Sequence, residues 1–205
     1  MNRRRAAAWP FADLEPGAYD LIVVDPPWRF EVRSAAGRGR TPEDHYKTMT
    51  VGEIAALPVG ALAARNTACV LWTTWPHLVA ANAVRVLSAW GFKPKTGGTW
   101  YKTCKNGKGH LGLGYILREV SEPFVIATRG APRFTGKARG KIEAGADLSF
   151  DGLARREHSR KPEEFFRFIH EALREIRRPC ELFARQRRRG WDSWGDELDK
   201  FGEGP

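Results

Sequence analysis

Short apolar runs alternate with amphipathic stretches along this chain, a pattern typical of an α/β fold. Residues 19–24 form a β-branched, apolar run, as expected of a strand buried on both faces of a parallel sheet. Other short apolar runs predict further strands at residues 68–74, 99–103, 124–128 and 180–184. Because helical patterns separate several of these runs, the strands are expected to lie in one sheet with helices against it.

Helices are predicted at residues 50–57, 76–90 and 162–178. Thr50 with Glu53 three residues later forms a capping-box signal, and Pro76 and Pro162 suit the first turn of a helix. The second and third segments each place apolar side chains on one face. With no internal repeat or interdomain linker, the 205 residues predict one domain, a three-layer α/β sandwich with a largely parallel sheet.

The charge balance favours a polyanionic partner. Lys and Arg number 34 against 24 Asp and Glu, a formal net charge of +10, which suits nucleic acid better than a neutral metabolite. Basic, glycine-containing segments near 29–45, 104–114 and 129–157 are expected to be flexible loops. The basic clusters are Arg29, Arg33, Arg38 and Arg40; Lys102, Lys105 and Lys108; Arg133, Lys137, Arg139 and Lys141; and Arg187, Arg188 and Arg189.

Other classes of protein are disfavoured by what the sequence contains. Its three cysteines are far apart and lack CxxC spacing, which argues against a disulfide framework or a zinc knuckle. No apolar run approaches the ~20 residues of a membrane span, and the basic start is followed by too short an apolar stretch for a signal peptide. No histidine set has metal-ligand spacing. We therefore expect a cytoplasmic protein without a membrane partner or a metal.

The strongest chemical signal is Asp25-Pro26-Pro27-Trp28, directly after the first predicted strand. Ligands of open α/β sheets bind beyond the carboxyl ends of the strands. The prolines fix the backbone and remove two donors, the aspartate adds an acceptor, and the tryptophan adds a flat apolar face. This composition predicts an acceptor-rich slot for a planar base, in which Asp25 and the Pro26 carbonyl hold both N–H groups of an exocyclic amine. The alternative is a turn that merely ends the strand.

The sequence resembles the DPPW-type adenine-amino methyltransferases, the MT-A-seventy family, over nearly its whole length. Beyond the Asp25-to-Trp28 motif, the resemblance rests on segments in matching order: residues 45–50 (His-Tyr-Lys-Thr-Met-Thr), 71–73 (Leu-Trp-Thr), 99–103 (Thr-Trp-Tyr-Lys-Thr), 121–123 (Ser-Glu-Pro), 158–163 (His-Ser-Arg-Lys-Pro-Glu), 181–185 (Glu-Leu-Phe-Ala-Arg) and 191–197 (Trp-Asp-Ser-Trp-Gly-Asp-Glu).

That resemblance implies a Rossmann-like αβα sandwich that binds S-adenosyl-L-methionine and methylates the N-6 amino group of adenine. It also implies a permuted order, with the catalytic motif before the cofactor motif. Asp25 and Pro26 match the amine-holding positions, Trp28 the base-stacking position, and Pro27 shapes the turn. The residues matching cofactor-binding positions are Asp25, Lys161, Glu181, Leu182, Phe183, Arg185, Asp196 and Glu197. Many relatives carry Asn where this chain has Asp196.

On the substrate side the resemblance points to Trp72, Trp100 and Glu122, and we add Tyr46, Lys102 and the loop arginines Arg33, Arg38 and Arg40. The two tryptophans also fit as core aromatics on strands. The acids could be solvated surface groups, and any single basic cluster could be ordinary surface.

The predicted function is N-6 methylation of adenine in nucleic acid by a monomer or homodimer. DNA is preferred over RNA because the chain looks like the small bacterial and phage members. The alternatives are an RNA adenosine methyltransferase, a catalytically silent nucleic-acid-binding subunit, and methylation of a small amine or free nucleotide.

Overall fold

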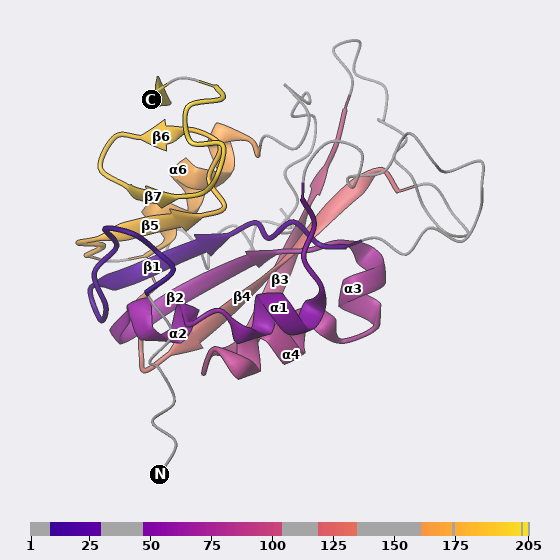
Figure 1. The fold of residues 1–205 in the computed structure, drawn as a ribbon, viewed down its shortest axis with the longest axis horizontal. Coiled ribbons are helices and arrows are strands. Elements are labelled where there is room, and N and C mark those ends of the chain that lie inside the picture. Colours follow the sequence, from indigo (N-terminus) through magenta and orange to yellow (C-terminus); the bar gives the residue numbers. More distant parts are fainter. Residues whose placement is uncertain are drawn as a thin grey trace.

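A six-stranded sheet forms the centre of the protein (Figure 1). The computed structural model describes residues 9–29, 47–103, 119–134, 161–173 and 175–201, and the backbone of 203–204. The strands of the sheet are β1 (Tyr19–Val24), β2 (Ala63–Trp72), β3 (Lys93–Tyr101), β4 (Ser121–Arg129), β5 (Pro179–Leu182) and β7 (Asp192–Trp194). Two short strands, β6 (Arg187–Arg188) and β8 (Glu203–Gly204), pair with each other beside it.

The sheet is largely parallel, as predicted, and one of its six strands, β4, runs in the opposite direction. Its order is β3-β4-β2-β1-β5-β7. The pairs β1–β2, β1–β5 and β5–β7 are parallel, whereas β4 is antiparallel to both β2 and β3. Parallel neighbours need a crossover, usually a helix. A helical segment follows β2 before β3 begins, whereas β3 and β4 pair antiparallel with each other.

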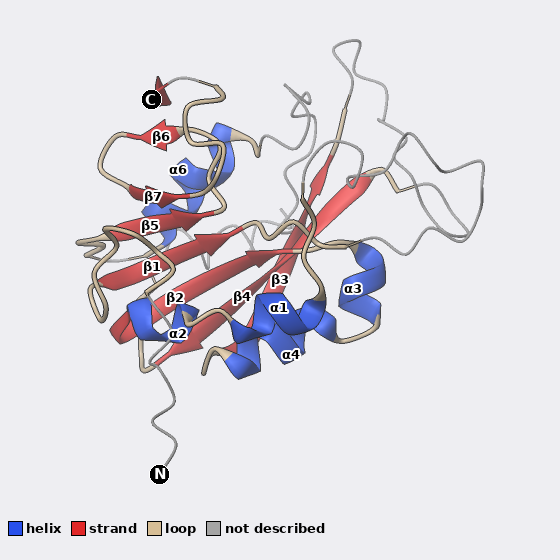
Figure 2. Ribbon diagram, viewed as in Figure 1, coloured by secondary structure: helices blue, strands red, loops and turns tan. Residues whose placement is uncertain are grey.

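Four helices belong to the layer on one face of the sheet (Figure 2). They are α1 (Val51–Ala56), α2 (Val59–Leu62), α3 (Trp75–Val79) and α4 (Asn82–Ala89). The predicted capping box is confirmed, since Thr50 and Glu53 bond each other's backbone at the start of α1. The single helix predicted at 76–90 is instead broken in two, because Ala81 adopts a left-handed φ of 58°.

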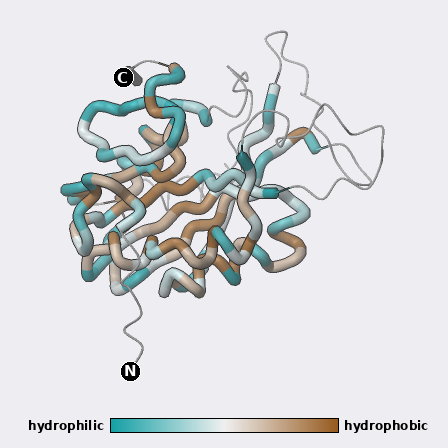
Figure 3. The backbone as a smooth tube through the Cα atoms, viewed as in Figure 1, coloured by the Kyte–Doolittle hydropathy of each residue, from teal (hydrophilic) through white to brown (hydrophobic). Residues whose placement is uncertain are grey.

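The opposite face carries α6 (Glu163–Ala172). Its Phe165, Phe166 and Ile169 pack against Leu21 and Trp72 of the sheet. The predicted helix over 162–178 is too long, because Leu173 is extended (ψ 139°) and bridges to Phe134. Two separate cores on the two faces confirm the three-layer α/β sandwich, and Figure 3 shows the apolar central strands between polar outer segments.

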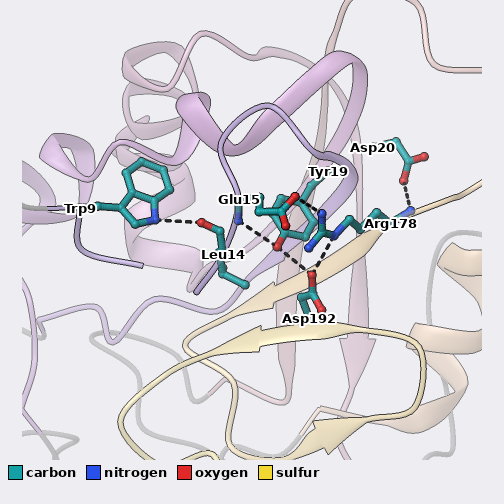
Figure 4. Close-up of polar contacts among 7 residues, drawn as sticks. All are labelled: Trp9, Leu14, Glu15, Tyr19, Asp20, Arg178 and Asp192. Atoms are coloured by element: carbon teal, nitrogen blue, oxygen red, sulfur yellow. Dashed lines mark hydrogen bonds and ion pairs between the residues drawn. The ribbon is translucent and has the colours of Figure 1, made fainter. Parts of the chain in front are cut away.

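At the amino ends of β1, β5 and β7, a polar network ties the N-terminal segment to the sheet (Figure 4). The Tyr19 hydroxyl donates to Asp192 at 2.8 Å. Arg178 pairs with the same carboxylate at 3.0 Å and with Glu15. The backbone N–H of Arg178 donates to Asp20. These contacts lie at the end of the strands away from the Asp25 motif, so their role is to hold the sheet together.

Within the part of the chain that is described, no helix combines the length and apolar character needed to cross a membrane.

Candidate active site

The predicted site residues gather at one edge of the sheet. The register aligns Val24 with Leu71 and with Leu182, and Leu182 with Trp194, so β1, β2, β5 and β7 all end there. Since β4 runs the opposite way, its first residues lie at this edge too, beside the end of β3. The motif that begins at Asp25 therefore occupies the carboxyl edge, where ligands of open α/β sheets bind.

A chain of four charged side chains crosses this edge. Lys161, just before α6, places its Nζ atom 2.6 Å from Asp25 Oδ2 and 2.7 Å from Glu122 Oε1. The other oxygen of Glu122 lies 2.5 Å from Lys102 Nζ. The Lys161 side chain is only 3% exposed, and its ammonium lies 5.2 Å from the centre of the Trp72 ring. Each of these four charged side chains contacts at least one of opposite charge, as burial of a charge requires.

These contacts set the protonation of the site. Burial alone would raise the pKa of Glu122, but the positive charges of Lys102 and Lys161 outweigh it and lower that pKa to about 2. Burial opposes the charge of Lys161, yet Asp25 and Glu122 raise its pKa above the ordinary value. For Asp25, burial raises the pKa despite Lys161, and the charge of Glu122 acts in the same direction. Lys161 is therefore a permanent cation between two acids.

The Asp25-to-Trp28 turn is rigid. The Pro26 carbonyl accepts the Trp28 N–H at 2.8 Å, and the Pro27 carbonyl accepts the Met49 N–H at 2.8 Å. The Trp28 indole N–H donates to the Trp72 carbonyl at 3.0 Å. Trp28 as a whole residue is 5% exposed, and its ring stacks on His77 with 4.7 Å between centroids. One face of this ring is thus already covered, and Trp28 fixes the turn rather than offering the open stacking surface that we expected.

Trp72 and Trp100 lie in the core, which favours the structural alternative for both. Trp72 is fully buried against Phe124 and Phe165, and Trp100 is 2% exposed. Their rings support the lysines of the site, since Lys102 Nζ lies 5.4 Å from the centre of the Trp100 ring. Neither ring offers a surface to a target base.

The predicted cofactor residues follow β5 and β7. Glu181 at the end of β5 is buried and bonded by Arg188 at 3.0 Å, and Arg185 lies 3.3 Å from Glu197. Asp196 is exposed. The Phe183 backbone has a φ of 61°, and its ring packs on Trp194. The Leu182 side chain is fully buried in the core, which leaves only its backbone for a ligand.

Some predicted residues lie outside the described part of the chain and stay predictions: Tyr46, Arg33, Arg38, Arg40, and most of the three basic loops.

The Arg187–Arg189 cluster was predicted as ordinary or phosphate-binding surface, and for Arg188 that was wrong. Its side chain is 4% exposed and bound to two carboxylates. In the described ranges, no group of three or more His, Cys, Asp or Glu side chains could hold a metal ion.

Comparison with known proteins gives the same assignment. The MT-A70 family model matches residues 19–197. The chain belongs to the MT-A70 family. It is similar to the N6-methyladenosine RNA methyltransferase MTA1 of Cryphonectria parasitica, with 30% identity over 91% of this chain and 54% of that protein. It is also similar to the type II methyltransferase M.MunI of a Mycoplasma species, with 25% identity over 92% of this chain and 81% of that protein. The human N(6)-adenine-specific methyltransferase METTL4 is 27% identical over 89% of this chain and 38% of its own length.

The chain thus spans about half the length of the two MTA1 relatives.

Two features of the site were not predicted from the sequence. One is the contact of Lys161 with both Asp25 and Glu122, and the other is the burial of Arg188. A signal for the second was present, because Glu181 in the otherwise uncharged buried strand β5 needs a positively charged partner inside the fold.

The donor set at this edge fits S-adenosylmethionine. The methionine end of that molecule carries an ammonium and a carboxylate, and the site presents the complementary pair Asp25 and Lys161 within 2.6 Å of each other. Its ribose hydroxyls would need acceptors, and Glu181, Asp196 and Glu197 are acceptors of that kind near the ends of β5 and β7. The residues present are therefore of the chemical types that S-adenosylmethionine would require.

Proposed function

We propose that this protein transfers a methyl group from S-adenosyl-L-methionine to the N-6 amino group of adenine in nucleic acid. The observation that carries the proposal is the Asp25–Lys161 ion pair at the carboxyl edge of the sheet. It places an acceptor-rich, rigid turn beside a buried cation, at the place where an α/β enzyme binds its ligands.

Asp25 and Pro26 hold the amine. The contact with Lys161 engages Asp25 Oδ2, so Oδ1 can accept one N–H of an adenine amino group. The Pro26 carbonyl bonds the Trp28 N–H, and its second lone pair can accept the other N–H. Two such bonds favour a pyramidal nitrogen whose lone pair is free to attack, which an amine conjugated with a ring otherwise lacks.

Lys161 and the acidic residues near the ends of β5 and β7 then orient the cofactor. When bound, S-adenosylmethionine supplies a methyl group on a positively charged sulfur. Lys161 and Asp25 would hold its methionine end, and Glu181, Asp196 and Glu197 would accept from its ribose hydroxyls. The amine nitrogen must lose one proton in the reaction, and the Asp25 carboxylate that already bonds it is the acceptor at hand. Positioning of the two reactants is the main catalytic device.

We propose DNA as the polymer. Support comes from the extent of similarity, which covers 81% of the type II methyltransferase but 54% of the MTA1 RNA methyltransferase of Cryphonectria parasitica and 48% of that of Pyricularia oryzae. The net charge of +10 fits either polymer. If the target lies in a duplex, the adenine must leave the stack to reach Asp25.

The experiment supplies S-adenosylmethionine with a labelled methyl group and adenine-containing DNA and RNA in parallel. We expect label in DNA, on the N-6 position, and none after Asp25→Ala. That variant keeps its fold because Lys161 retains Glu122. Asp13→Ala, which removes an exposed aspartate, is the matched control and should be fully active.

Three outcomes would redirect the proposal. Label only in RNA would replace DNA as the substrate. Polynucleotide binding without transfer to either polymer would support the silent subunit. Transfer to free adenosine alone, with oligonucleotide binding that does not weaken with salt, would support the small-amine alternative.

A further inference from the structure

Arg188 has surroundings unlike those of its neighbours in the sequence. Its Nε atom lies 3.0 Å from Glu181 Oε2, and its Nη1 atom contacts Glu163 Oε2. The guanidinium lies 3.5 Å from the centre of the Phe166 ring. Gln186 completes the cluster by donating to the other oxygen of Glu163 at 2.7 Å. A side chain read from the sequence as surface is thus the centre of a buried polar cluster.

The two carboxylates held by Arg188 belong to different parts of the proposed cofactor site. Glu163 is in the first turn of α6, two residues after Lys161. Glu181 is on β5, one residue before Leu182, whose carbonyl lies 3.4 Å from the Asp25 nitrogen. One guanidinium therefore joins the segment that carries Lys161 to the strand that runs beside Asp25.

We propose that Arg188 is a positioning residue for the cofactor site, holding Glu181 and the start of α6 in the arrangement that binds S-adenosylmethionine. This inference rests on the proposed function. Arginine suits the task because its planar fork donates in two directions at once, whereas a lysine ammonium is a single point charge. The Phe166 ring beneath it fixes the plane of the fork.

The charge of Arg188 also acts on Glu181. Burial raises the pKa of Glu181 to about 7, and Arg188 opposes that rise. The negative charges of Asp25, just after β1, and of Glu163, on α6, add to the rise. Removing the arginine charge thus raises the pKa of Glu181 further and leaves it neutral at physiological pH. A neutral Glu181 is a weaker acceptor for a ribose hydroxyl, so affinity should increase with pH through this transition.

The test measures the Kd of S-adenosylmethionine by titration calorimetry from pH 6 to pH 9 for the whole chain and for three variants. We expect Arg188→Gln to weaken binding at least tenfold at pH 7 and to move the midpoint of the pH dependence upward. Arg187→Gln is the matched control. Its side chain is 55% exposed and pairs with the exposed Asp199, so both the affinity and the midpoint should match the wild type.

Glu163→Gln removes a negative charge near Glu181, so its expected effect on the midpoint of the pH dependence is opposite to that of Arg188→Gln. The midpoint should move downward, a result that a general loss of packing would not produce. Wild-type affinity and an unchanged midpoint in Arg188→Gln would overturn the inference. If that variant does not fold, an unchanged midpoint in Glu163→Gln overturns it instead. Failure of the wild type to bind S-adenosylmethionine at all would count against the proposed function itself.

Discussion

Replacing Lys161 by Met is the most direct test of the charge chain at the site. The change removes a cation that is 3% exposed and that contacts Asp25 and Glu122 at 2.6 and 2.7 Å. A methionine fills a similar volume, so packing against Trp72 is largely kept. What remains is two acids at a buried position that have lost their shared cation.

The size of the effect follows from the pKa of Glu122. Its lowering from 4.5 to about 2 corresponds to roughly 3 kcal/mol of stabilisation at neutral pH, supplied jointly by Lys102 and Lys161. Breaking a buried ion pair on one side costs about 3–5 kcal/mol. Lys102 contributes to the Glu122 shift as well, so the expected cost for Lys161→Met rests on its burial and on its contacts with both Asp25 and Glu122: about 3 kcal/mol lost from the free energy of unfolding at pH 7.

The pH dependence has a definite sign. The depressed pKa of Glu122 stabilises the wild type fully above pH 4.5, and that contribution is lost as the pH falls toward 2. The Lys161→Met variant lacks, at every pH, the share of this stabilisation that Lys161 contributes. The difference in stability between the two proteins should therefore narrow as the pH is lowered from 7 to 4 and below.

Urea unfolding at pH 7, 5 and 4, followed by tryptophan fluorescence, measures this difference. Lys102→Met is the control: Lys102 is 25% exposed and pairs with Glu122, so solvent screens its charge and its loss should cost clearly less, about 1 kcal/mol. A deficit for Lys161→Met below about 1 kcal/mol at pH 7, or one that is the same at pH 7 and pH 4, would refute this reasoning.

Three further substitutions test the scaffold around the site. Trp28→Phe removes the bond to the Trp72 carbonyl and should lower the free energy of unfolding by about 1–3 kcal/mol; a neutral result in urea unfolding would mean that this bond does not hold the turn. Gly195→Ala places a methyl group 2.5 Å from the Ala184 carbonyl, which forces the strand ends apart, so we expect weaker S-adenosylmethionine binding by calorimetry; unchanged affinity would exclude that displacement. Thr50→Ala deletes the confirmed cap of α1 and should cost about 1 kcal/mol in thermal unfolding without changing methyl transfer; lost transfer would mean that the cap also supports the turn at Pro27 through Met49.

The sequence was most informative where local pattern and global position agree. The run at 19–24 is apolar at almost every position because β1 is central and buried on both faces. Its end at Asp25 could therefore be placed at the carboxyl edge without a structure. The amphipathic stripe of α6 and the cap of α1 were readable for the same reason, since each needs only a few consecutive residues.

Properties that depend on distant partners could not be read in this way. The direction of β4 depends on how the chain returns after β3, which no local pattern encodes. Ala81 breaks the helix at a residue that is normally a strong helix former. Arg187 and Arg188 are adjacent residues of the same type, yet Arg188 is the one that forms ion pairs with Glu163 and Glu181. These partners lie 25 and 7 residues away in the sequence.

The reversed direction of β4 has an evolutionary consequence. Because β3 ends and β4 begins at the same rim, the stretch between them departs from and rejoins the sheet within reach of Glu122. The pairs that fix β4 against β2 and β3 begin at Ser121 and end at Tyr101, so changes between these two residues leave those pairs in place. If the proposed function holds, exchanging the stretch between relatives would test whether it contributes to the choice of target.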